Sequence, residues 1–106
     1  MLIEERCYVL KGDYTPAMYI EIYRQTGALE LQQKVLGRLL GFFTTEIGEL
    51  NALVHLWGYD SFEERLRRRT LLAADPLWQA YLGRIRPMLQ SMNNRLLTPT
   101  DFSPIR

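Results

Sequence analysis

His55 is the only histidine in a chain of 106 residues, and its side chain is the one best suited to proton transfer. Trp57 and Tyr59 follow it at a spacing of two, so on a strand the three side chains would share one face. An imidazole in this setting could act as a general base or as a haem ligand. It could equally be a core or interface residue held by one hydrogen bond, and we favour that interpretation. No carboxylate lies at strand spacing from it, which argues against a metal site.

A cluster of arginines is the second group that could do chemistry. It comprises Arg65, Arg67, Arg68 and Arg69. Two of them follow a glutamate by four positions, a spacing at which opposite charges pair on a helix. Arg65 and Arg69 remain, and they could hold an anionic ligand or a carboxylate of a partner chain. The net charge is only +1 and no aromatic platform accompanies the cluster, so we do not expect nucleic-acid binding.

Aromatic residues at strand or helix spacing form the third group. They are Tyr8, Tyr19, Tyr23, Trp78 and Tyr81. Such rings usually belong to the core, but a cleft of apolar rings with a few polar groups is also the usual form of a small-molecule site. Arg6, Asn94 and Arg95 could then orient a ligand. The candidate ligand-binding residues are Tyr8, His55, Trp57, Arg69, Trp78, Tyr81 and Arg95, and His55 is the one catalytic candidate.

Several classes of site are excluded by the absence of their patterns. The nucleotide-binding glycine loops, the serine triad and the zinc motifs are missing. The one cysteine, Cys7, can form neither an internal disulfide nor a cysteine-based metal site. We therefore predict no cofactor and no metal.

The same features predict where the protein works. A lone thiol suits a reducing compartment. Glu4, Glu5 and Arg6 stand where a signal peptide would need an apolar run, and no apolar stretch approaches the ~18 residues of a membrane span. We expect a cytoplasmic protein without membrane insertion.

Periodicity and capping signals predict the elements that position these residues. Strands are expected over Leu2–Lys11, Arg38–Thr45, Asn51–Tyr59 and Met88–Leu97. Helices are expected to begin at Thr15-Pro16, at Ser61 with Glu64 as its capping-box partner, and at Asp75-Pro76. The first helix should continue to Gly37. The second should turn Phe62, Leu66, Thr70 and Ala73 inward.

The resulting order, β-α-β-β-α-β, is that of the ferredoxin-like α+β fold, with helices on one face of an antiparallel sheet. Residues 1–106 form one domain, of which 98–106 are an extended tail.

Both faces of the central hairpin are apolar. One face is expected to carry Leu39, Phe43, Leu53 and Trp57, and the other Leu40, Phe42, Val54 and Leu56. The helices can cover only one of them, and an exposed apolar patch of this extent usually marks a partner surface. We predict a homodimer packed sheet against sheet, because symmetric dimers are the commonest oligomers. The alternative is that the tail covers the second face.

The chain resembles the NIPSNAP family over nearly its whole length. The similar segments are Leu56–Arg65, Arg67–Arg69, Ala74–Leu82, Asn94–Pro99 and Phe102–Pro104, with the hairpin motifs Gly41–Phe43 and Val54–Trp57. The resemblance implies a dimeric α/β barrel in which two sheets face each other and substrates lie between sheet and helices. It implies no catalytic residues, because the family offers none to carry over, and relatives range from cofactor-independent monooxygenases to haem-degrading enzymes.

Three functions therefore remain open. The first is a homodimer that binds a small apolar or aromatic molecule in a cleft between sheet and helices. The second is a non-enzymatic protein-interaction module, in which the aromatic residues would be packed solid. The third is a cofactor-independent, monooxygenase-like enzyme. His55 and Trp57 are accordingly site, core or interface residues.

Overall fold

The computed structural model describes residues 1–106 as four strands and four α-helices, with a short 3₁₀ turn before the last strand. The strands are β1 (Leu2–Leu10), β2 (Arg38–Thr44), β3 (Ala52–Tyr59) and β4 (Leu89–Leu97). The helices are α1 (Pro16–Gln25), α2 (Ala28–Leu36), α3 (Phe62–Ala74) and α4 (Pro76–Ile85), and the 3₁₀ turn η1 is Arg86–Met88. All strand pairs are antiparallel, in the order β2-β3-β1-β4. The predicted ferredoxin-like α+β fold is confirmed.

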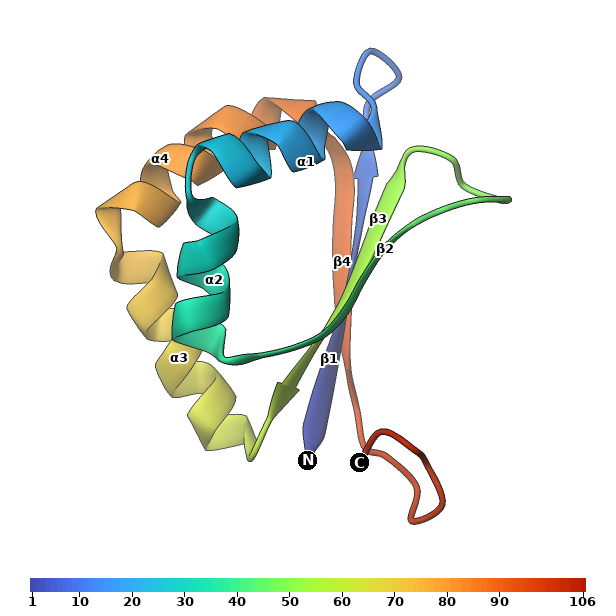
Figure 1. The fold of residues 1–106 in the computed structure, drawn as a ribbon, viewed down its shortest axis with the longest axis vertical. Helices are drawn as coiled ribbons and strands as arrows, with labels where there is room; N and C mark the ends of the chain where they lie inside the picture. The colour runs from blue at the N-terminus through green and yellow to red at the C-terminus, as the bar shows by residue number, and fades with distance from the viewer.

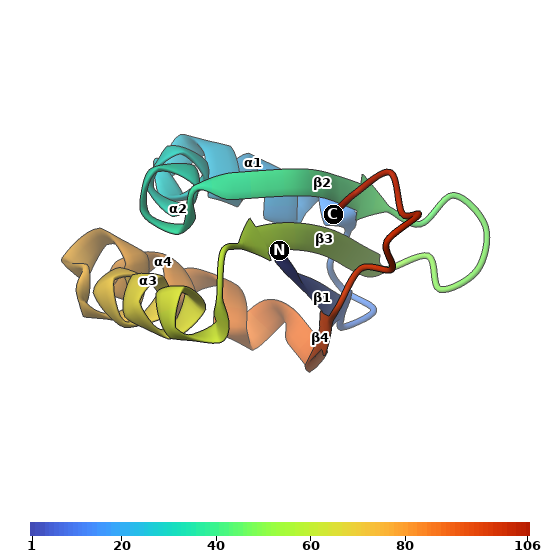
Figure 2. The ribbon, with the colours of Figure 1, turned by 90° about the horizontal axis from the view of Figure 1, so that it is seen from below.

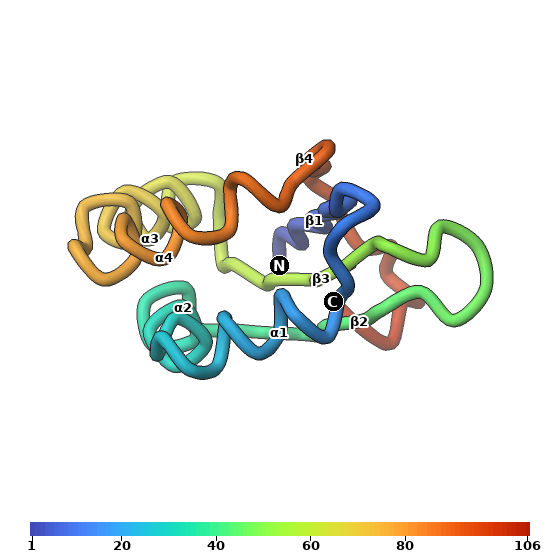
Figure 3. Tube along the Cα trace, turned by 90° about the horizontal axis from the view of Figure 1, so that it is seen from above, coloured from blue at the N-terminus to red at the C-terminus, as the bar shows by residue number.

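The helices and the sheet form two layers. Figure 1 shows all four helices on one side of the sheet, while no helix covers the other side. Seen from below, α1 and α2 lie beside β2, and α3 and α4 form a second row toward β4 (Figure 2). The same two rows are separate from above, where the β2–β3 loop extends away from the helices (Figure 3). The buried core lies between the layers and includes Tyr8, Leu53, Trp57 and Tyr81.

Side chains cap three of the helices as the sequence predicts. Thr15, Ser61 and Asp75 each accept a backbone N–H from two or three residues further on, at 2.8 to 3.2 Å. Only half of the predicted capping box forms, because the Glu64 carboxylate accepts hydrogen bonds from Arg67 and Arg68 and does not return to Ser61.

The first helical segment is broken at Gly27, where one continuous helix was predicted. Gly27 has a φ of 80°, a left-handed conformation that a right-handed helix cannot continue through. Thr26 ends α1, and Figure 1 shows α2 turning sharply away from it.

The inward face of α3 differs from the prediction. Phe62 and Leu66 are 51% and 55% exposed, whereas Arg65 and Arg69 reach toward Glu4 on β1. Apolar periodicity fails here because Glu4 is a buried carboxylate, and a buried charge without an ionic partner is strongly destabilising.

The two faces of β2 also differ from the prediction. The register shifts between Leu39 and Gly41, so that β2 holds one extra residue there. Phe42 consequently joins Leu39 on the helix side and stacks on His55, while Phe43 is 53% exposed on the other side. A β-bulge exchanges the faces of every later residue, and simple alternation cannot foresee it.

The face of the sheet away from the helices, which we term the outer face, remains largely apolar. By strand register it carries Ile3, Cys7, Val9, Phe43, Val54, Leu56 and Leu97. Leu40, at the bulge, lies against Gly58 on the same face. The tail does not cover it: residues 98–106 curl at the lower end of β4 in Figure 1, and Phe102 is 81% exposed. None of the helices has the length and hydropathy to cross a membrane.

Candidate functional site

A cavity of about 170 Å³ lies between the sheet and the helices. Fifteen residues line it, ten of them hydrophobic, and they come from all four strands and all four helices. Six aromatic side chains line it, and we term them the ring wall: Tyr8, Tyr19, Tyr23, Phe42, Trp78 and Tyr81. Its remaining polar groups belong to Arg6, Gln32, His55, Arg69 and Arg86. No aspartate or glutamate lines it.

His55 is held in one orientation by its neighbours. Its ring stacks on Phe42 with centroids 4.7 Å apart and meets the edge of Tyr8 at 4.9 Å. Its Nδ1 accepts a hydrogen bond of 2.7 Å from the indole Nε1–H of Trp57, so in the neutral ring the proton is on Nε2. This Nε2 is buried without a partner. Burial, together with the charges of Arg6 and Arg69, lowers the pKa of His55 to about 3.

Beside His55 lies a buried carboxylate surrounded by arginines. Glu4 is fully buried, and its Oε2 accepts hydrogen bonds from Arg6 at 2.9 Å, Arg65 at 2.7 Å and Asn94 at 2.7 Å. Arg69 lies further away, with its Nη1 3.9 Å from the Oε1 of Glu4. Burial alone would raise the pKa of Glu4, but these hydrogen bonds and positive charges outweigh it and hold that pKa at about 2.

The charges in this group do not balance. Arg6, Arg65 and Arg69 contribute three positive charges against the single negative charge of Glu4, which leaves two in excess. Arg69 also has an Nη1 that is buried without a hydrogen-bond partner. Because Arg6 and Arg69 line the cavity and no acidic residue does, the excess positive charge lies against the cavity.

Tyrosines on the helix side bond to one another. Tyr81 donates its hydroxyl to Tyr19 at 2.7 Å, and Tyr23 donates to Gln32. Burial raises the pKa of all three tyrosines, so they are neutral phenols at neutral pH. The cavity therefore contains no negative charge of its own.

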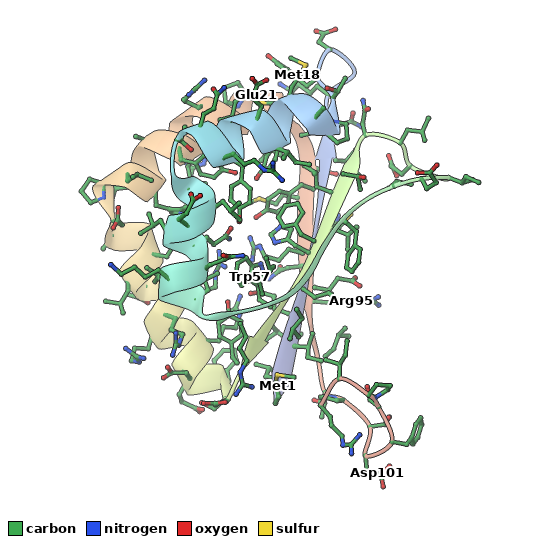
Figure 4. All side chains as sticks on the ribbon, in the orientation of Figure 1. Met1, Met18, Glu21, Trp57, Arg95 and Asp101 are labelled. Atoms are coloured by element: carbon green, nitrogen blue, oxygen red, sulfur yellow. The ribbon has the colours of Figure 1, made fainter.

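Five of the seven predicted ligand-binding residues line this one cavity. They are Tyr8, His55, Arg69, Trp78 and Tyr81. Trp57 is behind His55 as its hydrogen-bond donor. Arg95 is on the outer face and pairs with Glu5 at 2.8 Å, away from the cavity. Figure 4 shows Trp57 between the helices and the sheet, and Arg95 on the opposite side of the sheet.

Sequence reasoning did not identify Glu4 as a buried residue, because three charged residues in a row at the start of a strand suggest exposure to solvent. The signal was the alternation Glu4, Arg6, Tyr8, because residues at a spacing of two share a face with the apolar core residue Leu10. Phe42 was assigned to the wrong face because of the bulge, and Gln32 was assigned to no site. No group of three histidine, cysteine, aspartate or glutamate side chains is placed to hold a metal ion.

Comparison with known proteins places the chain among relatives. The NIPSNAP family model matches residues 3–104. A NipSnap homolog of Dictyostelium discoideum is 37% identical over 71 residues, which are 67% of this chain and 32% of that protein. The chain therefore spans only about a third of that relative's length.

Solved structures agree with this assignment. A NIPSNAP family protein from Agrobacterium tumefaciens has a TM-score of 0.93 and 42% identity, covering 99% of this chain and 98% of that one. A putative antibiotic biosynthesis monooxygenase from Nitrosomonas europaea shares the fold, with a TM-score of 0.67 at 10% identity, over 93% and 98% of the two chains. With a family model covering nearly every residue and a matching structure at this identity, the chain belongs to the NIPSNAP family.

Proposed function

We propose that this protein binds a small apolar or aromatic compound in the cavity between sheet and helices. The observation behind the proposal is the cavity itself. In a pure interaction module, the aromatic side chains between sheet and helices would be expected to pack without a cavity. Its volume of about 170 Å³ is close to that of an engineered apolar cavity of ~150 Å³ that accepts benzene. The ligand is therefore a compound of about one ring.

The walls suit such a ligand. Phe42, Trp78 and Tyr81 provide ring faces and edges, which attract another aromatic ring in stacked or edge-on geometry. Arg86 and Met92 are exposed, so the lining reaches the surface where η1 leads into β4. A small ligand could enter there without unfolding the helix layer.

Thermal-shift measurements with single-ring compounds test this proposal. A compound that binds the folded chain stabilises it by RT ln(1 + [L]/Kd), so the melting temperature should rise with concentration. Leu82→Trp should abolish the shift, because Leu82 lines the cavity and a larger side chain would fill it. Leu77→Trp, on the same helix but outside the lining, is the matched control. Shifts that persist in Leu82→Trp would contradict binding in this cavity.

We further propose that the protein works as a homodimer formed through the outer face. Val54 and Leu56 are half-buried at the centre of that face, with Phe43 exposed beside them. An apolar sheet face without a helix layer is typical of a buried interface. A second copy is the simplest occupant, because two such faces pack symmetrically and each carries the Glu5–Arg95 pair at one edge.

Light scattering tests the dimer. The wild-type chain should have twice its monomer mass at micromolar concentration, and Val54→Lys should reduce it to the monomer. Leu66→Lys is the control, since Leu66 is 55% exposed on the helix side. A wild-type monomer, or dissociation by Leu66→Lys alone, would overturn the outer face as the interface.

A further inference from the structure

We infer that the ligand of this cavity carries an anionic oxygen group, and that it is a single-ring aromatic carboxylate whose oxygens accept hydrogen bonds from Arg69 and His55. This inference rests on the proposed function and adds to it the chemical class of the ligand. It follows from charge, from unpaired donors and from the arrangement of ring and polar walls.

The charge around the cavity favours a negative partner. Three arginines surround Glu4, and no second carboxylate lies among them. An uncompensated charge is costly to bury, and it is usually paired or hydrogen-bonded. Arg69 is only 22% exposed and is the arginine furthest from Glu4, at 3.9 Å, so it is the one available to a ligand.

Two of the five buried side-chain atoms without hydrogen-bond partners are donors that belong to cavity-lining residues, and such donors bind carboxylates. His55 is 2% exposed, lines the cavity and has its Nε2–H unpaired, because Trp57 occupies its Nδ1. Arg69 also lines the cavity, and its Nη1 makes no hydrogen bond, since the nearest carboxylate oxygen, Oε1 of Glu4, lies 3.9 Å away. Leaving buried donors without partners costs about 1–3 kcal/mol each. A ligand oxygen beside either donor would satisfy it, whereas a purely apolar ligand would satisfy neither.

The ring wall and the donors lie on neighbouring parts of the lining. Phe42 stacks directly on His55, and Tyr81 belongs to the helix layer above them. A ligand that places its ring among Phe42, Trp78 and Tyr81 can therefore direct an acidic group toward His55 and Arg69. Benzoate has this composition and a size of about one ring, so it is the natural probe.

Calorimetric titration of the wild-type protein with benzoate and with benzamide tests the inference. The two compounds have nearly the same shape, but only benzoate is charged at neutral pH. Benzoate should bind at least about tenfold more tightly, equivalent to about 1.4 kcal/mol. Equal affinities would overturn the anionic inference and leave the proposed function intact. Binding of neither compound would overturn both.

Substitution of the two donors locates the effect. Arg69→Gln should weaken benzoate binding about tenfold or more and benzamide binding much less, because only the carboxylate pairs with the charge of Arg69. His55→Gln should weaken the binding of both compounds, because the carbonyl oxygen of benzamide can also accept the Nε2–H. Arg84→Gln is the matched control, because Arg84 is exposed and does not line the cavity. If Arg84→Gln weakened benzoate binding as much as Arg69→Gln, the preference would reflect overall charge and the assignment to Arg69 would be wrong. The comparison of benzoate with benzamide on the wild-type protein stands even if a variant fails to fold.

Discussion

The indole N–H of Trp57 donates to Nδ1 of His55 over 2.7 Å, and this one bond leaves Nε2 as the protonated nitrogen of the neutral imidazole, buried without a partner. The two residues are two positions apart on β3, so their side chains lie on the same face of the sheet and within reach of each other. A residue that lies outside the cavity thus determines the chemistry of one that lines it.

The first prediction concerns the tautomer of His55. Nitrogen NMR at neutral pH should show a neutral ring protonated on Nε2, because burial and the nearby arginines lower the pKa of His55 to about 3 and Nδ1 is an acceptor. In Trp57→Phe the donor to Nδ1 is lost, so the tautomers should mix and the protein should lose about 1–3 kcal/mol of stability. A cationic ring at neutral pH in the wild-type protein would contradict the arrangement.

The second prediction concerns stability at acidic pH. Folding lowers the pKa of His55 from 6.5 to about 3, so below pH 6.5 the unfolded chain binds a proton that the folded chain does not. The free energy of unfolding should therefore decrease as pH falls, by up to about 1.4 kcal/mol per pH unit. Glu4 adds to the loss only below pH 4.5, since its pKa falls from 4.5 to about 2 on folding. The window between pH 6.5 and 4.5 thus reports on His55.

Urea titrations across that window measure the effect. His55→Gln, which cannot take up a proton, should show a flatter dependence of unfolding free energy on pH than the wild-type protein. An equally steep dependence in both would assign the loss to other groups.

The third prediction compares two neighbouring glutamates on β1. Glu4→Gln removes the carboxylate that pairs the buried arginines, and should destabilise the fold by about 3–5 kcal/mol. Glu5→Gln breaks only the outer-face pair with Arg95, whose side chain is 67% exposed, and should cost about 0–1 kcal/mol. Chemical denaturation of both variants measures the difference. Similar costs would show that Glu4 does not organise the arginines.

Parts of this arrangement follow from the sequence because they depend on short-range signals. Thr15 and Asp75 precede a proline at the first helical position, and both cap their helices as predicted. The order of the four strands along the chain was predicted in the same way.

Long-range effects explain the parts that sequence reasoning missed. Phe42 changed faces because of one extra residue near Leu39, which leaves no mark in the hydrophobic pattern. Arg65 and Arg69 turn inward because of Glu4, which is 61 residues from Arg65 in the chain. A charged helix face normally indicates contact with solvent. Here two of its arginines pair with Glu4 on the sheet, and this contact is visible only in the three-dimensional structure.

The fourth prediction concerns two glycines in the helix layer. Gly27 has a φ of 80°, so Gly27→Ala should destabilise the protein by about 1–2 kcal/mol. Gly83 lies within α4 with open space around its Cα, so Gly83→Ala should stabilise by up to about 1 kcal/mol through helix propensity. Thermal unfolding of the two variants should therefore show shifts of opposite sign. Stabilisation by Gly27→Ala would contradict the break between α1 and α2.

The most direct measurement is a crystal structure of the protein grown with benzoate. We expect the ring to lie among Phe42, Trp78 and Tyr81, with carboxylate oxygens about 2.7–3.2 Å from Nη1 of Arg69 and Nε2 of His55. A cavity that holds only water, or benzoate bound with its carboxylate turned away from both donors, would contradict the account.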